Sequence, residues 1–254
     1  MCHNTHVMGT SERKQRERAE RESLILDVGR KMLLKDGYHG LSMDRIAEEI
    51  EYSKGIVYQH FASKDDLLCG ISINLLREGV AFFHRASQLR GRPRERLTAI
   101  ALASQLLFRL HPDSFQAQLI IWVNAIADRA SQERREVMGQ LQTDLHVLLI
   151  GIVDDAIARN DLRLPPGVTP HNVMHGMWAM LVGADLTAQA PRFAKQWDTV
   201  EPAAVVRWNI QRLWDGYGWK PLSTAWDYAE TEKRTLTELF PEEYQVLQRS
   251  GLAL

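Results

Sequence analysis

Apolar residues recur at helical spacing along most of this chain, and this periodicity constrains the fold more than any other feature. No stretch alternates apolar and polar residues in the way that a half-buried strand does. Beyond Pro93, prolines separate the segments that the pattern predicts as helices, which are residues 94–110, 113–129, 131–160, 170–190 and 201–217. The sequence therefore predicts an all-α fold.

Four further helical patterns precede Pro93, and each has a recognisable start or stop. The first begins near Ser23 and ends at Asp36-Gly37, because glycine readily adopts the left-handed conformation that follows a helix. Ser42, Ser53 and Ser63 stand before the second, third and fourth patterns, and serine is a favoured N-cap. The second and third helices are short and adjoin, which predicts a helix-turn-helix, the motif that places its second helix in the major groove of DNA.

Charge and composition limit how such a chain can bind DNA. The 254 residues carry a formal net charge of -1, which excludes a protein that coats nucleic acid by bulk positive charge, so a local patch has to suffice. With two cysteines, one of them near the terminus, a stabilising disulfide is not expected. No apolar run approaches the roughly 20 residues that cross a bilayer, and no signal peptide is evident, so we expect no membrane association and a cytoplasmic location.

The residues on the two faces of the third helix differ in kind. Val57 and Phe61 lie one turn apart and are expected to face inward. The outer face offers hydrogen-bond donors, a flat ring and one glycine that leaves room for close approach, at Lys54, Gly55, Tyr58, Gln59 and His60. This chemistry suits contact with DNA phosphates and base edges.

These residues stand within a longer stretch that resembles the DNA-binding domain of the TetR/AcrR family. The resemblance is carried by the run from Gly37 to Met43, by Ile46-Ala47, and by the run from Ser53 to Leu68, which reads SKGIVYQHFASKDDLL. The remaining helical segments agree in length and order with the second domain of that family, although they carry none of its specific motifs. The resemblance implies an all-α chain with an N-terminal three-helix DNA-binding domain and a larger helical domain for ligand binding and dimerisation.

The resemblance also implies roles for individual residues in this DNA-binding domain. Phosphate contacts are expected from Ser42, Tyr58, His60 and Lys64. Contacts with base edges are expected from Lys54, Gly55, Ile56 and Gln59. Arg45 is placed to reach either a phosphate or a base, and the basic segment up to Arg21 reads as an extension toward the minor groove or the flanking phosphates. The expected partner is double-stranded, palindromic operator DNA.

For the second domain, the resemblance implies a small, apolar effector and a homodimer. The residues expected to line the ligand pocket are Leu75, Phe82, Leu106, Trp122, Ile126, Met138, Leu145 and Trp178. The residues expected to form the dimer interface are Met174, Met177, Leu181, Val206, Ile210, Leu213, Trp214 and Tyr217. Both sets also suit an ordinary helical core, and this alternative stays open.

The predicted organisation has four parts, and the predicted function is a regulator whose effector changes its affinity for the operator, with repression as the default outcome. The parts are a flexible basic arm over residues 1–20, the helix-turn-helix domain over 21–68, the ligand-binding and dimerisation domain over 69–220, and a helical extension over 221–254. No cofactor is expected. The extension departs from the minimal family pattern, and its role stays open.

An enzyme and a protein-protein adaptor are the two alternatives to a DNA-binding regulator. An enzyme finds no support, because the sequence lacks a nucleophile elbow, a phosphate-binding loop and a dinucleotide fingerprint. Cys2, His3 and His6 could together bind a metal, but three residues on a loose terminus are more often incidental, so no metal site is expected. The alternative function is a helical protein-protein adaptor that does not bind DNA.

Overall fold

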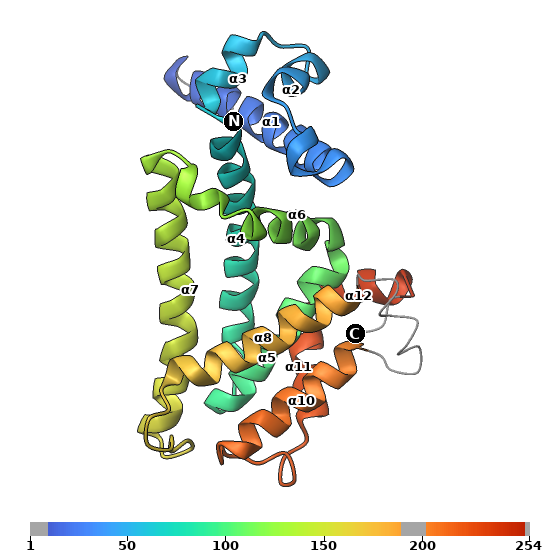
Figure 1. Cartoon of the computed structure of the whole chain (residues 1–254). Coiled ribbons are helices and arrows are strands. Elements are labelled where there is room, and N and C mark those ends of the chain that lie inside the picture. Colours follow the sequence, from blue (N-terminus) through green and yellow to red (C-terminus); the bar gives the residue numbers. More distant parts are fainter. Residues whose placement is uncertain (1–9, 189–201, 252–254) are drawn as a thin grey trace, which may run out of the picture. The chain divides into compact units, whose positions relative to one another are not determined.

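The computed structural model describes residues 10–188 and 202–251, and within these ranges every regular element is a helix. The described chain divides into two compact units (Figure 1). The N-terminal unit holds the residues up to Leu75 together with Asp113–Gly139, and the C-terminal unit holds Leu76–Pro112 together with the residues from Gln140 onward. The all-α prediction is confirmed.

The N-terminal unit contains the three predicted helices at the start of the chain. They are α1 (Thr10–Gly40), α2 (Met43–Glu49) and α3 (Lys54–His60), and the start of α4 (Lys64–Ser87) follows them. Gly37 interrupts α1 with a φ of 71°, which confirms the predicted stop near this residue. The unit also takes α6 (Pro112–Val123), the 3₁₀ turn η1 (Ile126–Arg129) and the first turns of α7 (Gln132–Ala158).

One apolar core holds the N-terminal unit together. Ile25, Ile46 and Phe61 are fully buried in it, and Ile121 and Ile126 from the α6–η1 region join the same cluster. Each such side chain contributes about 1.5–3 kcal/mol of burial free energy. Residues 113–139 therefore pack with the helix-turn-helix, whereas the sequence analysis assigned them to the second domain on sequence order alone.

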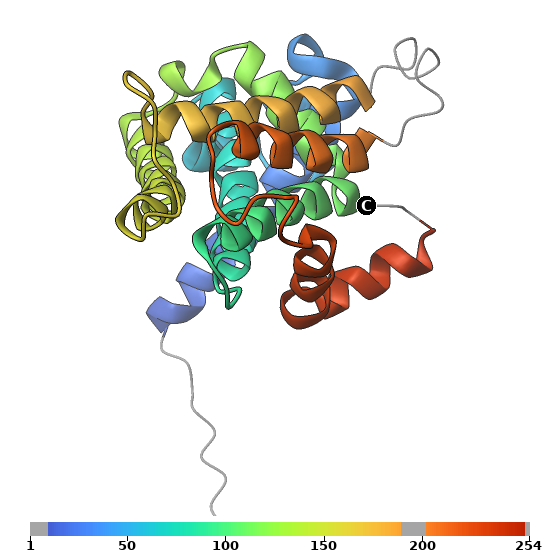
Figure 2. The ribbon, with the colours of Figure 1, turned by 90° about the horizontal axis from the view of Figure 1, so that it is seen from below.

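The C-terminal unit contains the remaining helices. They are the second half of α4, α5 (Pro93–Leu110), most of α7, α8 (Pro170–Ala188), α10 (Pro202–Gly216), α11 (Tyr228–Arg234), the π-helical turn η2 (Thr235–Leu239) and α12 (Pro241–Arg249). Figures 1 and 2 both show α8 and α10 running side by side, in agreement with their contacts. The bounds of α5, α7, α8 and α10 lie within about two residues of the prediction, and proline fixes where α5, α8 and α10 begin. Residues 189, 190 and 201 of the predicted helices lie outside the described residues.

The extension after Pro221 is helical, as expected, and packs onto the C-terminal unit. Its helix α11 contacts α5, and Phe240 is fully buried beside Phe82, with ring centroids 5.3 Å apart. Tyr228 is also buried and donates a hydrogen bond to the Pro221 carbonyl oxygen over 2.7 Å. The extension therefore shares the core of the unit.

By length and apolar composition alone, α4 is the one described helix that could cross a membrane. Just over half of its most apolar stretch is buried, at 56%. Leu67 and Leu68 lie in the core of the N-terminal unit, and Phe83 and Ala86 lie in the core of the C-terminal unit. The composition of α4 is thus accounted for by core packing.

Candidate nucleic-acid interface

A tight turn joins α2 to α3 and forms the predicted helix-turn-helix. Glu51 occupies the left-handed region with a φ of 57°, and the Tyr52 amide donates to the Ala47 carbonyl oxygen over 3.0 Å. Met43, Ile46 and Ala47 of α2 and Val57 of α3 are buried against the core of the N-terminal unit. Burial of these side chains fixes which face of α3 points outward.

The outward face of α3 carries the side chains that the sequence analysis assigned to DNA. Tyr58 is 50% exposed, and Lys54 and Gln59 are exposed beside it. A Cβ added at Gly55 would meet only the Ser53 hydroxyl, at 3.9 Å, so this position leaves the helix surface open. Ile56 is half-buried at the edge of this face. The face combines donors, an aromatic hydroxyl and an unobstructed backbone, which is the chemistry that groove recognition uses.

Lys54 is held in an ion pair with α2. Its Nζ lies 2.5 Å from Asp44 Oδ2, and this hydrogen bond raises the pKa of Lys54. Both side chains are largely exposed, so the pair contributes little to stability. A contact of Lys54 with a base or a phosphate, which stays a prediction, would require this pair to open.

Lys64 begins α4 in a second cluster of polar side chains. Its ammonium lies 4.3 Å from the centre of the Tyr38 ring, and partial burial lowers the pKa of Lys64 although Asp65 opposes the shift. The Tyr38 hydroxyl donates to Asp65 Oδ1 over 3.1 Å, and Arg129 Nε lies 2.8 Å from Asp65 Oδ2. Lys64 is thus placed at the first turn of a helix, where amides and a cation together attract phosphate.

His60 departs from the predicted role as a phosphate contact. Its side chain is only 5% exposed, and Nδ1 lies 3.6 Å from Glu22 Oε2 of α1. The ring turns inward because His60 ends α3 next to the buried Phe61, whose ring centroid lies 6.4 Å away. The structure does not present this side chain to solvent, so a phosphate contact through His60 would require the ring to move and stays a prediction.

Ser42 and Arg45 lie at the start of α2, and the Arg45 side chain already has two partners there. Ser42 is half-buried at the N-cap and makes no capping hydrogen bond through its side chain. Arg45 is exposed, pairs with Asp36 over 2.7 Å and donates to the Gly40 carbonyl oxygen over 2.9 Å. Of the three predicted N-caps, Ser63 accepts a hydrogen bond from the Asp66 amide at 3.1 Å, whereas Ser42 and Ser53 accept none from their helices.

The basic N-terminal segment is helical where it is described. Residues from Thr10 belong to α1, so the predicted flexible arm over 1–20 is an extension of this helix from Thr10 onward. Salt bridges one turn apart, Arg13 with Glu17 at 3.2 Å and Arg16 with Glu20 at 2.7 Å, favour the helix. Residues 1–9, with Cys2, His3 and His6, lie outside the described residues.

Two polar side chains outside the helix-turn-helix, which the sequence did not point to, contact a residue in the first turn of α4. Ser131 and Arg134, at the start of α7, both contact Asp66 near the end of the helix-turn-helix. Asp66 and Ser131 are 65 positions apart in the sequence. Because no local spacing pattern links such distant residues, the sequence held no signal for this contact.

The predicted pocket residues divide between the two units. Leu75, Trp122, Ile126 and Met138 belong to the N-terminal unit, and Phe82, Leu106, Leu145 and Trp178 belong to the C-terminal unit. Leu106, Ile126 and Met138 are buried, Leu75, Phe82, Leu145 and Trp178 are half-buried, and Trp122 is 44% exposed. The ligand-lining role of these residues stays a prediction.

The predicted dimer stripe lies mostly inside the C-terminal unit. Six of its members are at most 7% exposed and belong to the core, namely Met174, Met177, Leu181, Val206, Ile210 and Trp214, and Leu213 and Tyr217 are half-buried against that core. The helices α8 and α10 use this stripe to pack on each other and on α5, which fits the alternative of an ordinary helical core, and its role in a dimer interface stays a prediction. The larger apolar side chains left exposed on these two helices are Leu186, Val205 and Trp208.

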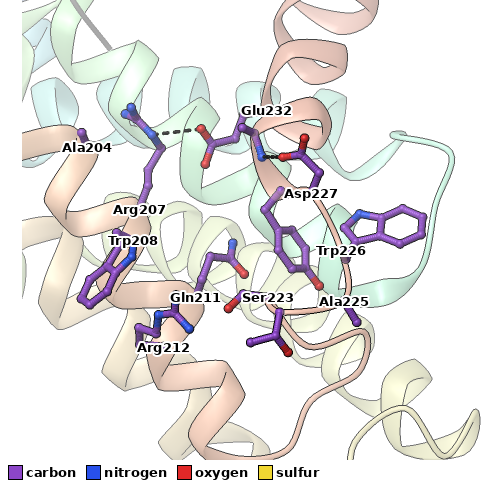
Figure 3. A pocket seen from close by; sticks show the side chains of 13 residues that line it. Ala204, Arg207, Trp208, Gln211, Arg212, Ser223, Ala225, Trp226, Asp227 and Glu232 are labelled. Carbon is purple, nitrogen blue, oxygen red and sulfur yellow. Dashed lines mark hydrogen bonds and ion pairs between the residues drawn. The ribbon is translucent and has the colours of Figure 1, made fainter.

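A surface groove of about 680 Å³ runs between α10 and the start of the extension (Figure 3). Trp208 and Trp226 line it and are 60% and 41% exposed. Arg207 is paired with Glu232 across the groove at 3.1 Å, and the Trp226 indole donates to the Thr231 hydroxyl over 3.1 Å. Among the described residues, no three histidine, cysteine or acidic side chains are grouped so that they could hold a metal.

Comparison with protein families places the interface within a known domain. Residues 25–69 match the model described as "Bacterial regulatory proteins, tetR family". The chain is 25% identical over 210 residues to the HTH-type transcriptional activator FasR of Mycolicibacterium smegmatis (strain ATCC 700084 / mc(2)155). That similarity covers 81% of this chain and 87% of the relative.

Solved structures share the fold over most of the chain. A putative transcriptional regulator from Pseudomonas aeruginosa PAO1 is 18% identical, with a TM-score of 0.60, and the match covers 85% of this chain and 94% of that one. FadR from Bacillus subtilis, solved in complex with stearoyl-CoA, is 14% identical with a TM-score of 0.57, covering 75% and 96%. At these identities the likeness supports the fold alone.

Proposed function

This chain is a DNA-binding transcription regulator of the TetR family, and from that premise we propose that it binds a palindromic operator as a homodimer under the control of a small-molecule effector. Each protomer presents its α3 to a major groove. In a two-fold dimer the two copies of α3 read half-sites about 34–36 Å apart. The effector acts by changing the affinity of this dimer for the operator.

The observation that carries the proposal is the division of α3 into two faces. Val57 is fully buried, whereas Lys54, Tyr58 and Gln59 are exposed and lie within two turns of one another. Binding to another protein does not require hydrogen-bond donors and a glycine together on one helix face. Together with the family match over residues 25–69, this favours DNA binding over the adaptor alternative.

Selection of bound fragments from sheared genomic DNA of the source organism tests the proposal. The purified chain is incubated with the fragments at moderate salt, and the retained DNA is sequenced. We expect enrichment of a two-fold symmetric sequence whose half-sites are one helical turn apart. Retention of fragments with no shared sequence would contradict the proposal.

We propose that the effector is a small molecule with a large apolar part. The C-terminal unit has an extensive apolar core, Phe82 and Leu145 at its edge are only half-buried, and Trp178 in the same unit is half-buried as well. FadR, which shares the fold, was solved with stearoyl-CoA, so that compound is a suitable first probe. We expect it to raise the melting temperature of the chain and to change its affinity for the operator. If neither quantity changes, the proposal of an effector with a large apolar part is contradicted.

The direction of regulation is a separate proposal. We propose repression as the default, while FasR, the relative at 25% identity, is named an activator. A reporter gene placed downstream of the selected operator separates the two. Expression that falls when the regulator is supplied supports repression, and expression that rises supports activation.

For the dimer, we propose an interface on the outer faces of α8 and α10. Leu186, Val205 and Trp208 are exposed there, and an exposed cluster of large apolar side chains favours a partner surface. Replacing Trp208 with Glu should shift the chain toward monomer in analytical ultracentrifugation, while Val246→Glu, an exposed position on α12 outside the groove that Trp208 lines, serves as the control. Equal effects of the two variants, or no effect of the first, would argue against this interface.

A regulator that acts on genomic DNA in a bacterial cell works in the cytoplasm, and we propose that location for this chain. The family is one of transcription regulators and not of enzymes. Fluorescence from a tagged copy should coincide with the nucleoid. Fluorescence confined to the cell envelope would contradict the proposed location.

A further inference from the structure

The first turn of α7 is joined to the helix-turn-helix by a group of polar contacts within the N-terminal unit. Asp66, only 4% exposed, accepts from the Ser131 amide at 3.1 Å, from the Ser131 hydroxyl at 2.6 Å and from the Ala62 amide at 3.2 Å. Both Ser131 bonds go to Oδ1, and Arg134 Nε lies 3.3 Å from Oδ2, the oxygen that also accepts from Ala62. The two carboxylate oxygens are therefore fully used by one residue before α4 and two residues at the start of α7.

Arg134 extends these contacts to α1 and to the end of α3. Its Nη2 donates to the His60 carbonyl oxygen over 3.1 Å and lies 3.3 Å from Glu22 Oε1. Its guanidinium lies 4.3 Å from the centre of the buried ring of Phe61, the C-cap residue that follows α3. One side chain thus touches α1, the end of α3 and the start of α4.

The surroundings are shaped to keep Arg134 in this position. A Cβ added at Gly70 on α4 would lie 3.1 Å from Arg134 Nη1 and 2.9 Å from Phe61, so glycine leaves the room that the guanidinium uses. The Arg134 side chain is 17% exposed, which reduces screening of its charge by water. Burial opposes ionisation of Asp66, yet the hydrogen bonds from Ser131 and Ala62 and the charge of Arg134 keep the pKa of this carboxyl below its usual value.

These contacts lie at the C-terminal end of α3, the helix that is proposed to enter the major groove. The carbonyl of His60 is among the last on α3, and the intrahelical bonds of a helix leave its final carbonyl oxygens free for other donors. A charged donor at that site fixes the end of α3, and Phe61 fixes the backbone that follows it. Ordering these groups before DNA arrives reduces the entropy lost when the complex forms.

We propose that Arg134 is a positioning residue for DNA recognition, which holds α3 in its reading orientation through the His60 carbonyl, the Phe61 ring and Asp66. The inference rests on the proposed function of α3. Because α7 begins in the N-terminal unit and ends in the C-terminal unit, the helix that positions α3 also belongs to the unit in which the effector is proposed to bind.

Two substitutions and a matched control test this role in the full chain. The variants are Arg134→Ala and Arg134→Lys, and the control is Arg135→Ala, the exposed neighbour on the same turn, whose own hydrogen bond goes to the Ala130 carbonyl. Affinity is measured for the selected operator and for an unrelated duplex of equal length. Amide hydrogen exchange over residues 54–61 is followed in parallel.

We expect Arg134→Ala to weaken operator binding by roughly tenfold or more, since charge-assisted hydrogen bonds to fixed partners are lost. Binding to the unrelated duplex should change by less than about twofold, because phosphate contacts do not depend on one fixed orientation. Exchange in α3 should accelerate. Arg134→Lys should fall between the wild type and Arg134→Ala, because lysine keeps the charge near Asp66 but not the fork geometry.

Three outcomes overturn the proposal: equal behaviour of Arg134→Ala and Arg135→Ala, equal loss for both duplexes, or unchanged exchange in α3. If Arg134→Ala does not fold, Ser131→Ala replaces it, because this change removes one donor without leaving a buried charge unpaired. That variant should lower the operator-to-unrelated affinity ratio by about two- to fivefold, and an unchanged ratio overturns the proposal. Absence of sequence preference in the wild type would instead contradict the proposed function itself.

Discussion

The outer face of α3 and the apolar face of α10 were both predicted to be contact surfaces, and the structure treats them differently. On α3, Lys54, Tyr58 and Gln59 are exposed where the prediction placed them. On α10, Ile210 and Trp214 are buried in the core of the C-terminal unit. The difference teaches that helical spacing predicts which polar side chains of α3 are exposed, whereas an apolar stripe does not show whether the same chain or a second copy covers it.

The largest expected effect is a loss of stability, and it compares a buried with an exposed tryptophan on α10. Trp214 is fully buried, with its ring centroid 5.5 Å from that of Trp219, so Trp214→Ala should reduce the free energy of unfolding by about 3–5 kcal/mol. Trp208, six residues earlier and 60% exposed, is the matched control, and Trp208→Ala should cost the fold less than about 1 kcal/mol. Chemical denaturation measures both. If the two variants lost equal stability, α10 would not have a buried and an exposed face.

A second prediction compares two carboxyls in the two units. Hydrogen bonds and Arg134 lower the pKa of Asp66, whereas burial raises the pKa of Asp185 on α8 to about 7 although Arg109 opposes the shift. A raised folded-state pKa means that the native state holds a proton that the unfolded state releases, so the contribution of Asp185 to stability falls as pH rises from about 4 to 7. For Asp66 the sign is opposite, and its contribution is lost in acid.

Asp185→Asn should therefore stabilise the chain at pH 8 by roughly 2 kcal/mol, about half of the unscreened value because the carboxyl is partly exposed. Near pH 4 the same variant should have little effect, since the native carboxyl is then already neutral. Unfolding in urea at the two pH values provides the measurement. An equal difference in unfolding free energy between variant and wild type at the two pH values would contradict the raised pKa of Asp185.

The smallest expected effect concerns a phosphate contact at the reading surface. Lys64→Ala should weaken binding to all duplexes alike and reduce the slope of log affinity against log salt by about 0.9, the value for one phosphate. Lys220→Ala removes an equal charge from an exposed site in the C-terminal unit and should leave the slope unchanged. Equal slopes for Lys64→Ala and wild type would place Lys64 away from the DNA backbone.

Much of the fold could be predicted from the sequence because its signals are local. Prolines set the starts of α5, α8 and α10, Gly37 interrupts α1 through its φ of 71°, and Ser63 caps α4 as expected. The exposed part of the candidate site followed for the same reason, since the spacing of Val57 and Phe61 fixes which residues of α3 face outward.

The remainder depends on contacts between distant parts of the chain. His60 turns inward because Glu22 and Phe61 surround it, and Arg134 reaches its carbonyl from α7. The core of the N-terminal unit includes Ile121 and Ile126, which follow α5 in the sequence. Periodicity does not show which core a distant apolar residue joins. Apolar periodicity shows that a helix has a buried face, but it does not show whether the same chain or a second copy covers it.

The most direct test of the account is selection of randomised duplexes by the wild-type chain and by a variant carrying both Lys54→Ala and Gln59→Ala. Both side chains are exposed on α3, so the variant should fold and retain its phosphate contacts. We expect the wild type to enrich a two-fold symmetric sequence and the variant to lose preference at particular positions in each half-site, with each lost contact costing about 1–3 kcal/mol of discrimination. Enrichment of the same sequence by both proteins would contradict the claim that α3 reads the operator.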